Sequence, residues 1–210
     1  MQSALLRKEG VNILIWFNPK KITHRAPQSL NKNFVQKIDR NDIKKIEEST
    51  PTIAPTIEIM FLKNESYEFT PQFDEMINQV NSGQKAYYCE TTEDVHHYFQ
   101  NLQKAYDSMS SNGYLLQIEL KETNKSLIDP RHIDSYQDEI QIVVNENNEL
   151  LLGWAGTHRL LIARILKINK VAGLVKNVDE KWAKKIFHDS KTKNLKIAIE
   201  RELNRMSLYK

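Results

Sequence analysis

The sequence predicts an α+β fold in which helices pack on a small mixed sheet. Apolar, β-branched runs at 11–17 and 171–178 are typical of strands. Apolar and polar residues alternate in 139–154, and the pattern breaks at Asn147-Asn148 and then resumes, which indicates a β-hairpin. Apolar residues at helical spacing in 71–83 and 91–113 predict helices between these strands. Strands and helices in this order favour a single mixed sheet with helices packed against it.

The first third of the chain contains one clear strand signal. "VNILIWF" (11–17) ends just before Asn18-Pro19, where proline removes a backbone donor. Residues 18–56 are irregular and polar, apart from a short helix expected at 40–50. "PTIEIMFLK" (55–63) favours a second extended segment, placed at a sheet edge because prolines precede and begin it.

Two helices are expected in the middle of the chain. The segment 71–83 has proline in its first turn and glycine at its end. The segment 91–113 has a threonine cap, acidic residues in the first turn and a terminal glycine. "YLLQIEL" (114–120) favours a short strand, and 121–138 form a polar loop.

The last third continues with a helix, a strand and a basic tail. "HRLLIARILKI" (158–168) predicts an amphipathic helix. "VAGLVKNV" (171–178) predicts a strand. Residues 179–206 predict a basic helix or a pair of helices, with Trp182 on the apolar side.

Composition limits the class of protein. The 210 residues contain one cysteine, Cys89, so a disulfide framework is excluded and a cytoplasmic location is the expectation. No apolar run is long enough to span a bilayer, so no membrane partner is expected. The apolar N-terminus lacks a small-residue cleavage site, which argues against a signal peptide.

Charge is strongly segregated along the chain. Residues 1–45 carry a net charge of +7, residues 46–150 carry −13, and residues 151–210 carry +9. The basic C-terminal third favours an anionic partner, such as a nucleotide or a nucleic acid. A solvated lysine-rich helix face would produce the same charge pattern, and the sequence does not separate the two.

The stretch "GWAGTHRLLIAR" (153–164) places glycine, a hydroxyl, an imidazole and a guanidinium at the start of a helix. The first N–H groups of a helix have no internal partners, so this position favours an anion. Gly156 would let the backbone approach the anion, and Thr157 could cap the helix or donate its hydroxyl. Arg159 offers a donor fork that fits phosphate, and His158 could move a proton near neutral pH. A plain structural turn is the alternative.

"ELLLGWAGTHRLLIARILKINKVAGLV" resembles the signature of the ParB/sulfiredoxin-like superfamily, in which a hairpin leads into a Gly-x-His-Arg turn. The upstream "YDSMSSNGYLLQ" resembles the helix end of the same family, and "SGQKAYYCETTEDVHHYF" resembles an extension found in one ParB-like subgroup. The resemblance implies an N-terminal extension over 1–90, a ParB/sulfiredoxin-like domain over 91–182, and a basic helical tail over 183–210. It also implies that phosphates of a nucleoside triphosphate, ATP or CTP, lie at Gly156, Thr157, His158 and Arg159, with Mg²⁺ as a companion ion.

Departures from the family pattern narrow the implied activity. Sulfiredoxins carry cysteine where this chain has Thr157, which argues against sulfinate reduction. DNA-clamp members continue into a helix-turn-helix domain, for which residues 179–210 are too short. Kinases of this fold use an acidic base near the turn, and Asp138 or Glu139 could serve, although a solvated strand entry is the alternative reading.

Two functions therefore stay open. The first is a Mg²⁺-dependent phosphotransferase or NTPase, with His158, Arg159, Glu139 and Asp138 as catalytic residues. The second is a non-catalytic module that binds a nucleotide or a nucleic acid, and a nuclease ranks below both. The polar loop that contains His132 and Asp134 could help to hold Mg²⁺, but we predict no protein-bound metal site, because the chain has no ligand cluster at metal-binding spacing.

Overall fold

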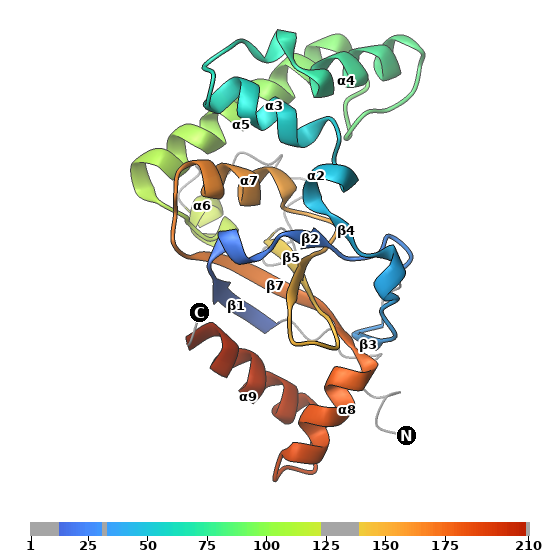
Figure 1. Ribbon diagram of the computed structural model, residues 1–210. Helices are drawn as coiled ribbons and strands as arrows, with labels where there is room; N and C mark the ends of the chain where they lie inside the picture. Colours follow the sequence, from blue (N-terminus) through green and yellow to red (C-terminus); the bar gives the residue numbers. More distant parts are fainter. Residues whose placement is uncertain (1–12, 31–32, 123–138, 209–210) are drawn as a thin grey trace.

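The computed structural model describes residues 13–30, 33–122 and 139–208 (Figure 1). Its centre is a mixed sheet of seven strands in the order β1-β7-β5-β6-β2-β4, with β3 paired to the end of β7. The strands are β1 (Ile13–Phe17), β2 (His24–Arg25), β3 (Val35–Gln36), β4 (Lys44–Lys45), β5 (Ile140–Val144), β6 (Leu150–Leu152) and β7 (Val171–Asp179).

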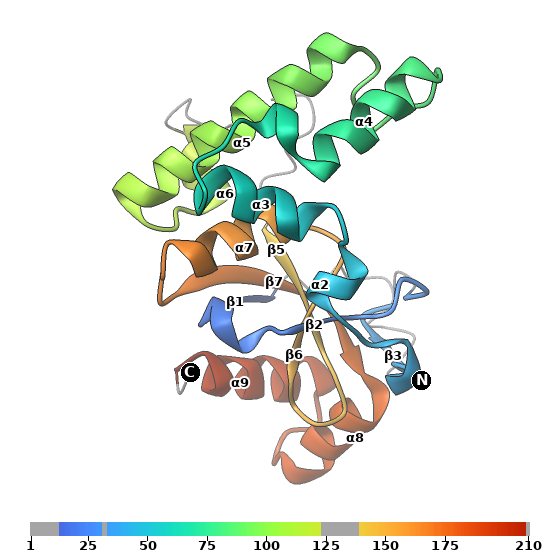
Figure 2. The same ribbon diagram turned by 45° about the horizontal axis from the view of Figure 1, so that its top comes forward.

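Strand β7 is the longest strand of this sheet and pairs with three others, β1, β3 and β5. It pairs antiparallel with β1 on one side and parallel with β5 on the other. Eight of its nine residues are buried, as expected for a strand that is covered on both faces. Figures 1 and 2 show the two covers, with α7 (Thr157–Ile165) on one face and α9 (Leu195–Leu208) on the other.

The remaining helices form a layer beyond α7 and a tail beside α9. Helices α3, α4 and α5 pack on the outer side of α7, while α8 leads from the end of β7 into α9 (Figure 2). Their bounds are α2 (Ile46–Ser49), α3 (Ile53–Phe61), α4 (Pro71–Asn81), α5 (Thr92–Asn112), α6 (Gln117–Glu122) and α8 (Glu180–Asp189). Short 3-10 turns occur at η1 (Pro19–Lys21), η2 (Arg40–Asp42) and η3 (Tyr67–Phe69).

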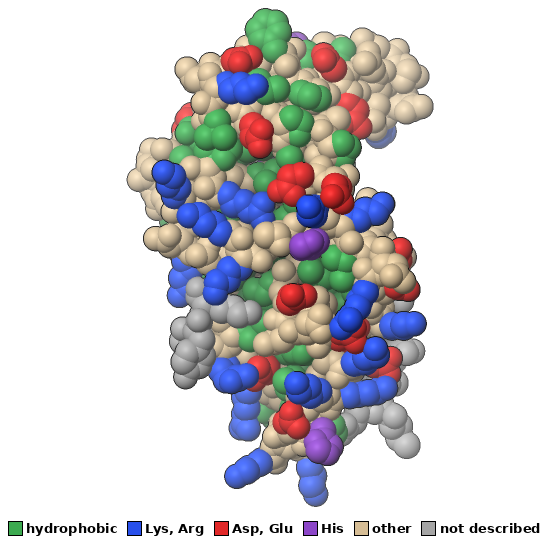
Figure 3. Space-filling view, in the orientation of Figure 1, with side chains coloured by type: hydrophobic (Ala, Val, Ile, Leu, Met, Phe, Trp, Pro, Cys, Tyr) green, Lys and Arg blue, Asp and Glu red, His purple; other side chains and the backbone are tan. Residues whose placement is uncertain are grey.

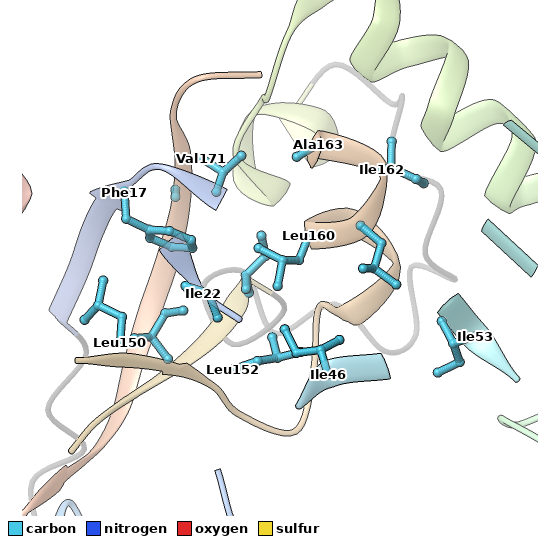
Figure 4. Packing of buried hydrophobic residues seen from close by; sticks show 14 of the residues in the cluster. Phe17, Ile22, Ile46, Ile53, Leu150, Leu152, Leu160, Ile162, Ala163 and Val171 are labelled. Atoms are coloured by element: carbon cyan, nitrogen blue, oxygen red, sulfur yellow. The ribbon is translucent and has the colours of Figure 1, made fainter. Parts of the chain in front are cut away.

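The core lies between the sheet and α7. Leu160 of α7 points toward Phe17 of β1, and Ala163 of the same helix lies beside Val171 of β7 (Figure 4). These four side chains are almost completely buried. Each large apolar side chain buried in this way contributes about 1.5–3 kcal/mol. Helix α7 is therefore fixed on the sheet by its apolar face, which in turn fixes the direction of its first turn.

Most predicted elements are confirmed. The strand at the start of the chain, the hairpin, the last strand and the helix pair at the C-terminus form as expected. Helix α5 begins with a full capping box, in which Thr91 accepts from the Asp94 N–H and the Asp94 carboxylate accepts from the Thr91 N–H. Gly113 ends the helix with a φ of 73°. The α+β class with one mixed sheet is thus correct.

Three predictions are wrong or only partly right. Residues 55–63 do not form an extended edge segment, because 53–61 are the helix α3. Pro55 lies in its first turn, where a missing N–H costs nothing, and so it does not signal a strand edge. Residues 114–120 form no strand, and α6 begins at Gln117 instead. The helix expected at 40–50 is reduced to the single turn α2.

The predicted segments do not coincide with units of this sheet. Four of its strands, β1 to β4, come from residues before 90, and the others come from residues after 138. Helix α8 runs across the boundary expected at 182. The N-terminal residues are therefore part of the same sheet as the motif. Within the described ranges, no helix is both long and apolar enough to cross a membrane.

Candidate functional site

Gly156 is the N-cap of α7 and has a left-handed backbone, with φ 93° and ψ 11°. A Cβ at this position would lie 2.6 Å from the Ile140 Cα, so the backbone of the turn passes directly over β5. Glycine also provides no capping side chain for the first turn. The first N–H groups of this nine-residue helix are thus left to other partners.

Thr157 is buried and does not cap the helix in the expected way. Its hydroxyl oxygen accepts a short hydrogen bond from the Nη2 group of Arg25, which lies at the end of β2. Strand β2 pairs with β6 through Arg25 and Leu152, and this pairing sets the position of the guanidinium beside the first turn of α7. The sheet therefore supplies a cation at the start of α7.

The Arg25 guanidinium is incompletely satisfied. Its Nε atom is buried and has no hydrogen-bond partner among the described residues. Burial lowers the pKa of Arg25, and the nearby Tyr87 phenol is uncharged at neutral pH because burial raises its pKa. Within the part of the chain that the structure describes, no carboxylate pairs with Arg25. A partly buried cation without a counterion is costly, so this position favours an added anion.

His158 is turned into the helical layer. Its Nε2 lies 3.0 Å from the Gln72 Oε1 and 3.3 Å from the Tyr98 hydroxyl. Gln72 also donates to that hydroxyl, so the three side chains form a closed set that ties α7 to α4 and α5. Burial, with the nearby charges of Arg159 and Arg25, lowers the pKa of His158 to about 4. The imidazole is neutral at pH 7 and is positioned as a structural partner.

Arg159 forms an internal ion pair. Its Nη1 lies 3.4 Å from the Glu139 Oε2. The Glu139 side chain is 1% exposed and also accepts from the Tyr114 hydroxyl at 2.5 Å and from the Gln117 N–H at 2.7 Å. These bonds hold the carboxylate as a buried acceptor for α6 and α7. Glu139 is therefore poorly placed to act as the predicted general base.

A cleft of about 970 Å³ opens beside the start of α7. Gly156, His158 and Arg159 line one end of it. The opposite wall comes from α5 and from the connection between α4 and α5, including Tyr87 and Tyr88. This volume is in the range of small-molecule sites. The motif thus borders a space large enough for a nucleotide-sized ligand.

The other residues named in the sequence analysis form no metal site among the described residues or lie outside them. Asp138, Asp134 and His132 lie outside the described residues. Within the described ranges, no cluster of three His, Cys, Asp or Glu side chains could hold a metal ion. Cys89 is buried, and burial raises the pKa of its thiol.

The basic C-terminal third includes α8 and α9, which lie on the opposite side of the sheet from α7. Lys and Arg side chains are frequent over the lower part of the face shown in Figure 3, where these helices lie. Several are already paired: Lys181 contacts Glu146, Lys184 contacts Glu180, and Arg205 contacts Glu202. Part of this charge therefore forms local ion pairs on the surface.

Sequence reasoning missed the residues that come from outside the motif. Arg25 belongs to the stretch 18–25, which stands out in the sequence only by its basic charge. Gln72 and Tyr98 had no signal at all, because their role depends on how α4 and α5 meet α7. Arg25 and Gln72 lie more than 80 positions before the residues of the motif that they contact, so no local pattern could indicate these contacts.

Comparison with family models, with curated proteins and with solved structures gives no match. The resemblance to the ParB/sulfiredoxin-like superfamily stays a prediction from the motif.

Proposed function

We propose that this protein binds a nucleoside triphosphate, with the phosphates at the first turn of α7. The backbone of Gly156 and Thr157 would face the negative oxygens, and Arg25 and Arg159 would supply positive charge. The adjoining cleft has room for the rest of the nucleotide.

The observation that carries the proposal is the uncompensated charge of Arg25. A guanidinium donor is already aimed at the Thr157 hydroxyl, while its Nε is buried and unpartnered among the described residues. An anion at the helix start would accept from this group and offset its desolvation. The predicted role of Arg159 is weaker in this geometry, since Glu139 already neutralises part of its charge.

Binding is better supported than phosphate transfer. Of the residues predicted for proton transfer, His158 and Glu139 are both held in internal hydrogen bonds. The pKa of His158, near 4, also makes the imidazole a weak base at pH 7. We assign no residue to the predicted Mg²⁺. The Glu139 carboxylate is already bound by Tyr114, Gln117 and Arg159, and Asp138, Asp134 and His132 lie outside the described residues.

The test is a thermal-shift titration of the full chain with ATP, CTP and inorganic tripolyphosphate, each with Mg²⁺. We expect all three to raise the melting temperature, and Arg25→Gln to remove most of this rise. Arg201→Gln is the matched control, because it removes the same charge from an exposed site on α9, across the sheet from α7. Equal shifts in the two variants would contradict the site, and phosphate release over time would establish turnover.

A further inference from the structure

The turn that leads into α7 contains a bulge against β5. The Gly153 N–H donates to the Gln141 carbonyl oxygen at 2.7 Å, and the Gln141 N–H donates to the Ala155 carbonyl oxygen at 3.0 Å. Both backbone groups of Gln141 are therefore used by the residues on either side of Trp154, which is left out of the pairing. Bulges of this kind re-aim a side chain and are frequent next to active sites.

Two glycines press this turn onto the strand. A Cβ at Gly153 would lie 2.9 Å from the Gln141 Cβ, and a Cβ at Gly156 would lie 2.6 Å from the Ile140 Cα. Gly156 is also the N-cap of α7. The backbone on both sides of Trp154 is thus held against β5, and this fixes the position of the tryptophan backbone relative to the first turn of α7.

Trp154 is exposed, and its indole has no partner among the described residues. The residue is 49% exposed and makes no hydrogen bond or ring contact within the described ranges. The other two tryptophans are packed. Trp182 is 2% exposed and its Nε1 donates to Asn148, while Trp16 meets the edge of the Tyr114 ring at 6.4 Å. An indole commonly buries its rings and gives its N–H a partner, so Trp154 is the exception in this fold.

Trp154 stands beside the proposed phosphate position. It precedes the Gly156 cap by two residues, so their Cα atoms are at most about 7 Å apart. Ala155, which lies between them, lines the cleft. The Arg25 guanidinium reaches the same turn, because it donates to the Thr157 hydroxyl. The start of α7 therefore combines helix N–H groups, a guanidinium and an exposed tryptophan within a short distance.

We propose that Trp154 stacks on the heteroaromatic base of the nucleotide bound at the start of α7. The inference rests on the proposed function, because the phosphates at α7 bring the base to the border of the cleft. Stacking on an aromatic side chain tolerates different bases, since every base has a π-face. Trp154 thus adds affinity for any nucleotide and selects nucleotides over inorganic polyphosphates.

The experiment measures dissociation constants of ATP, CTP and inorganic tripolyphosphate by calorimetry, each with Mg²⁺ and the full chain. We expect Trp154→Ala to weaken ATP and CTP by about 5- to 150-fold, as the loss of one stacked base predicts. Trp154→Phe keeps a ring and should keep most of the affinity. Tripolyphosphate should bind Trp154→Ala as it binds the wild type.

Tryptophan fluorescence gives a second measurement that does not depend on the alanine variant. ATP should quench the emission of the wild type, because the base covers the exposed indole, and should not quench that of Trp154→Phe. Tripolyphosphate should quench neither. Leu62→Ala is the matched control, because Leu62 is 63% exposed at the end of α3 and does not line the cleft.

Stacking is overturned if Trp154→Ala leaves the ATP and CTP affinities unchanged, or if it weakens tripolyphosphate as much as the nucleotides. The phosphate site survives either result when Arg25→Gln still removes tripolyphosphate binding. Conversely, nucleotide binding that depends on Trp154 but not on Arg25, with no binding of tripolyphosphate, would support the ring contact and overturn the phosphate site. No binding by any of the three compounds would overturn both.

Discussion

Replacing Gly156 by alanine tests the geometry on which the α7 site depends. Gly156 has a φ of +93°, and a Cβ built there would lie 2.6 Å from the Ile140 Cα and 2.9 Å from its Cγ1. The Cα is backbone of β5, a strand in the middle of the sheet, so it cannot turn aside as a flexible side chain could. The substitution must therefore move the helix start away from the strand.

The expected cost has two parts. Left-handed backbone costs an alanine about 1–2 kcal/mol. Forcing a methyl group into a packed site adds about 1–3 kcal/mol. Gly156→Ala should thus lower the free energy of unfolding by about 2–5 kcal/mol.

Gly83→Ala isolates the first part. Gly83 also has a positive φ, +79°, but a Cβ there would meet nothing within 4 Å. Urea unfolding followed by circular dichroism, with wild type and both variants, gives the two free energies. Gly83→Ala should cost only about 1–2 kcal/mol. If the two variants are destabilised equally, the helix start does not lie against β5 as described, and the position of the α7 site is wrong.

Two other outcomes follow from the same geometry. Arg159→Ala should lower the free energy of unfolding by about 3–5 kcal/mol, because the buried Glu139 carboxylate loses its ion-pair partner. Adding Glu139→Gln to this variant should restore part of the loss, measured by urea unfolding. The pKa of His158 is lowered from 6.5 to about 4, so its contribution to stability is complete above about pH 6.5 and disappears as the pH falls through 4. The free energy of unfolding, measured at pH 7, 5 and 4, should drop by on the order of 2–3 kcal/mol in total from this group. His158→Asn should flatten this drop.

Local signals predicted the elements that have strong caps or uniform burial. Helix α5 was predictable because Thr91 and Gly113 mark its two ends chemically. Strand β7 was predictable because a central strand is apolar on both faces. Helix α3 was not, since Pro55 occupies a position that suits the first turn of a helix as well as the edge of a sheet. Tertiary packing of Ile53, Ile57 and Met60 decides between the two.

The site was predictable only along its own stretch of chain. Gly156 at the start of a helix followed from the turn-forming residues and the apolar spacing after them. The partners of Thr157, His158 and Arg159 did not follow, because each comes from a different layer: β2, the α4–α5 pair and the segment before β5. Reading the motif alone therefore assigned Arg159 and His158 a freedom that the fold removes.

The polar side chains around the start of α7 differ in how completely the fold provides them with partners. Arg159 forms an ion pair with Glu139, and His158 forms a hydrogen bond with Gln72. These contacts hold α7 in place. Arg25 keeps a buried Nε without a hydrogen-bond partner among the described residues. This guanidinium adjoins the start of α7, because its Nη2 group donates to the Thr157 hydroxyl. An anion bound beside it would offset the desolvation of this buried cation.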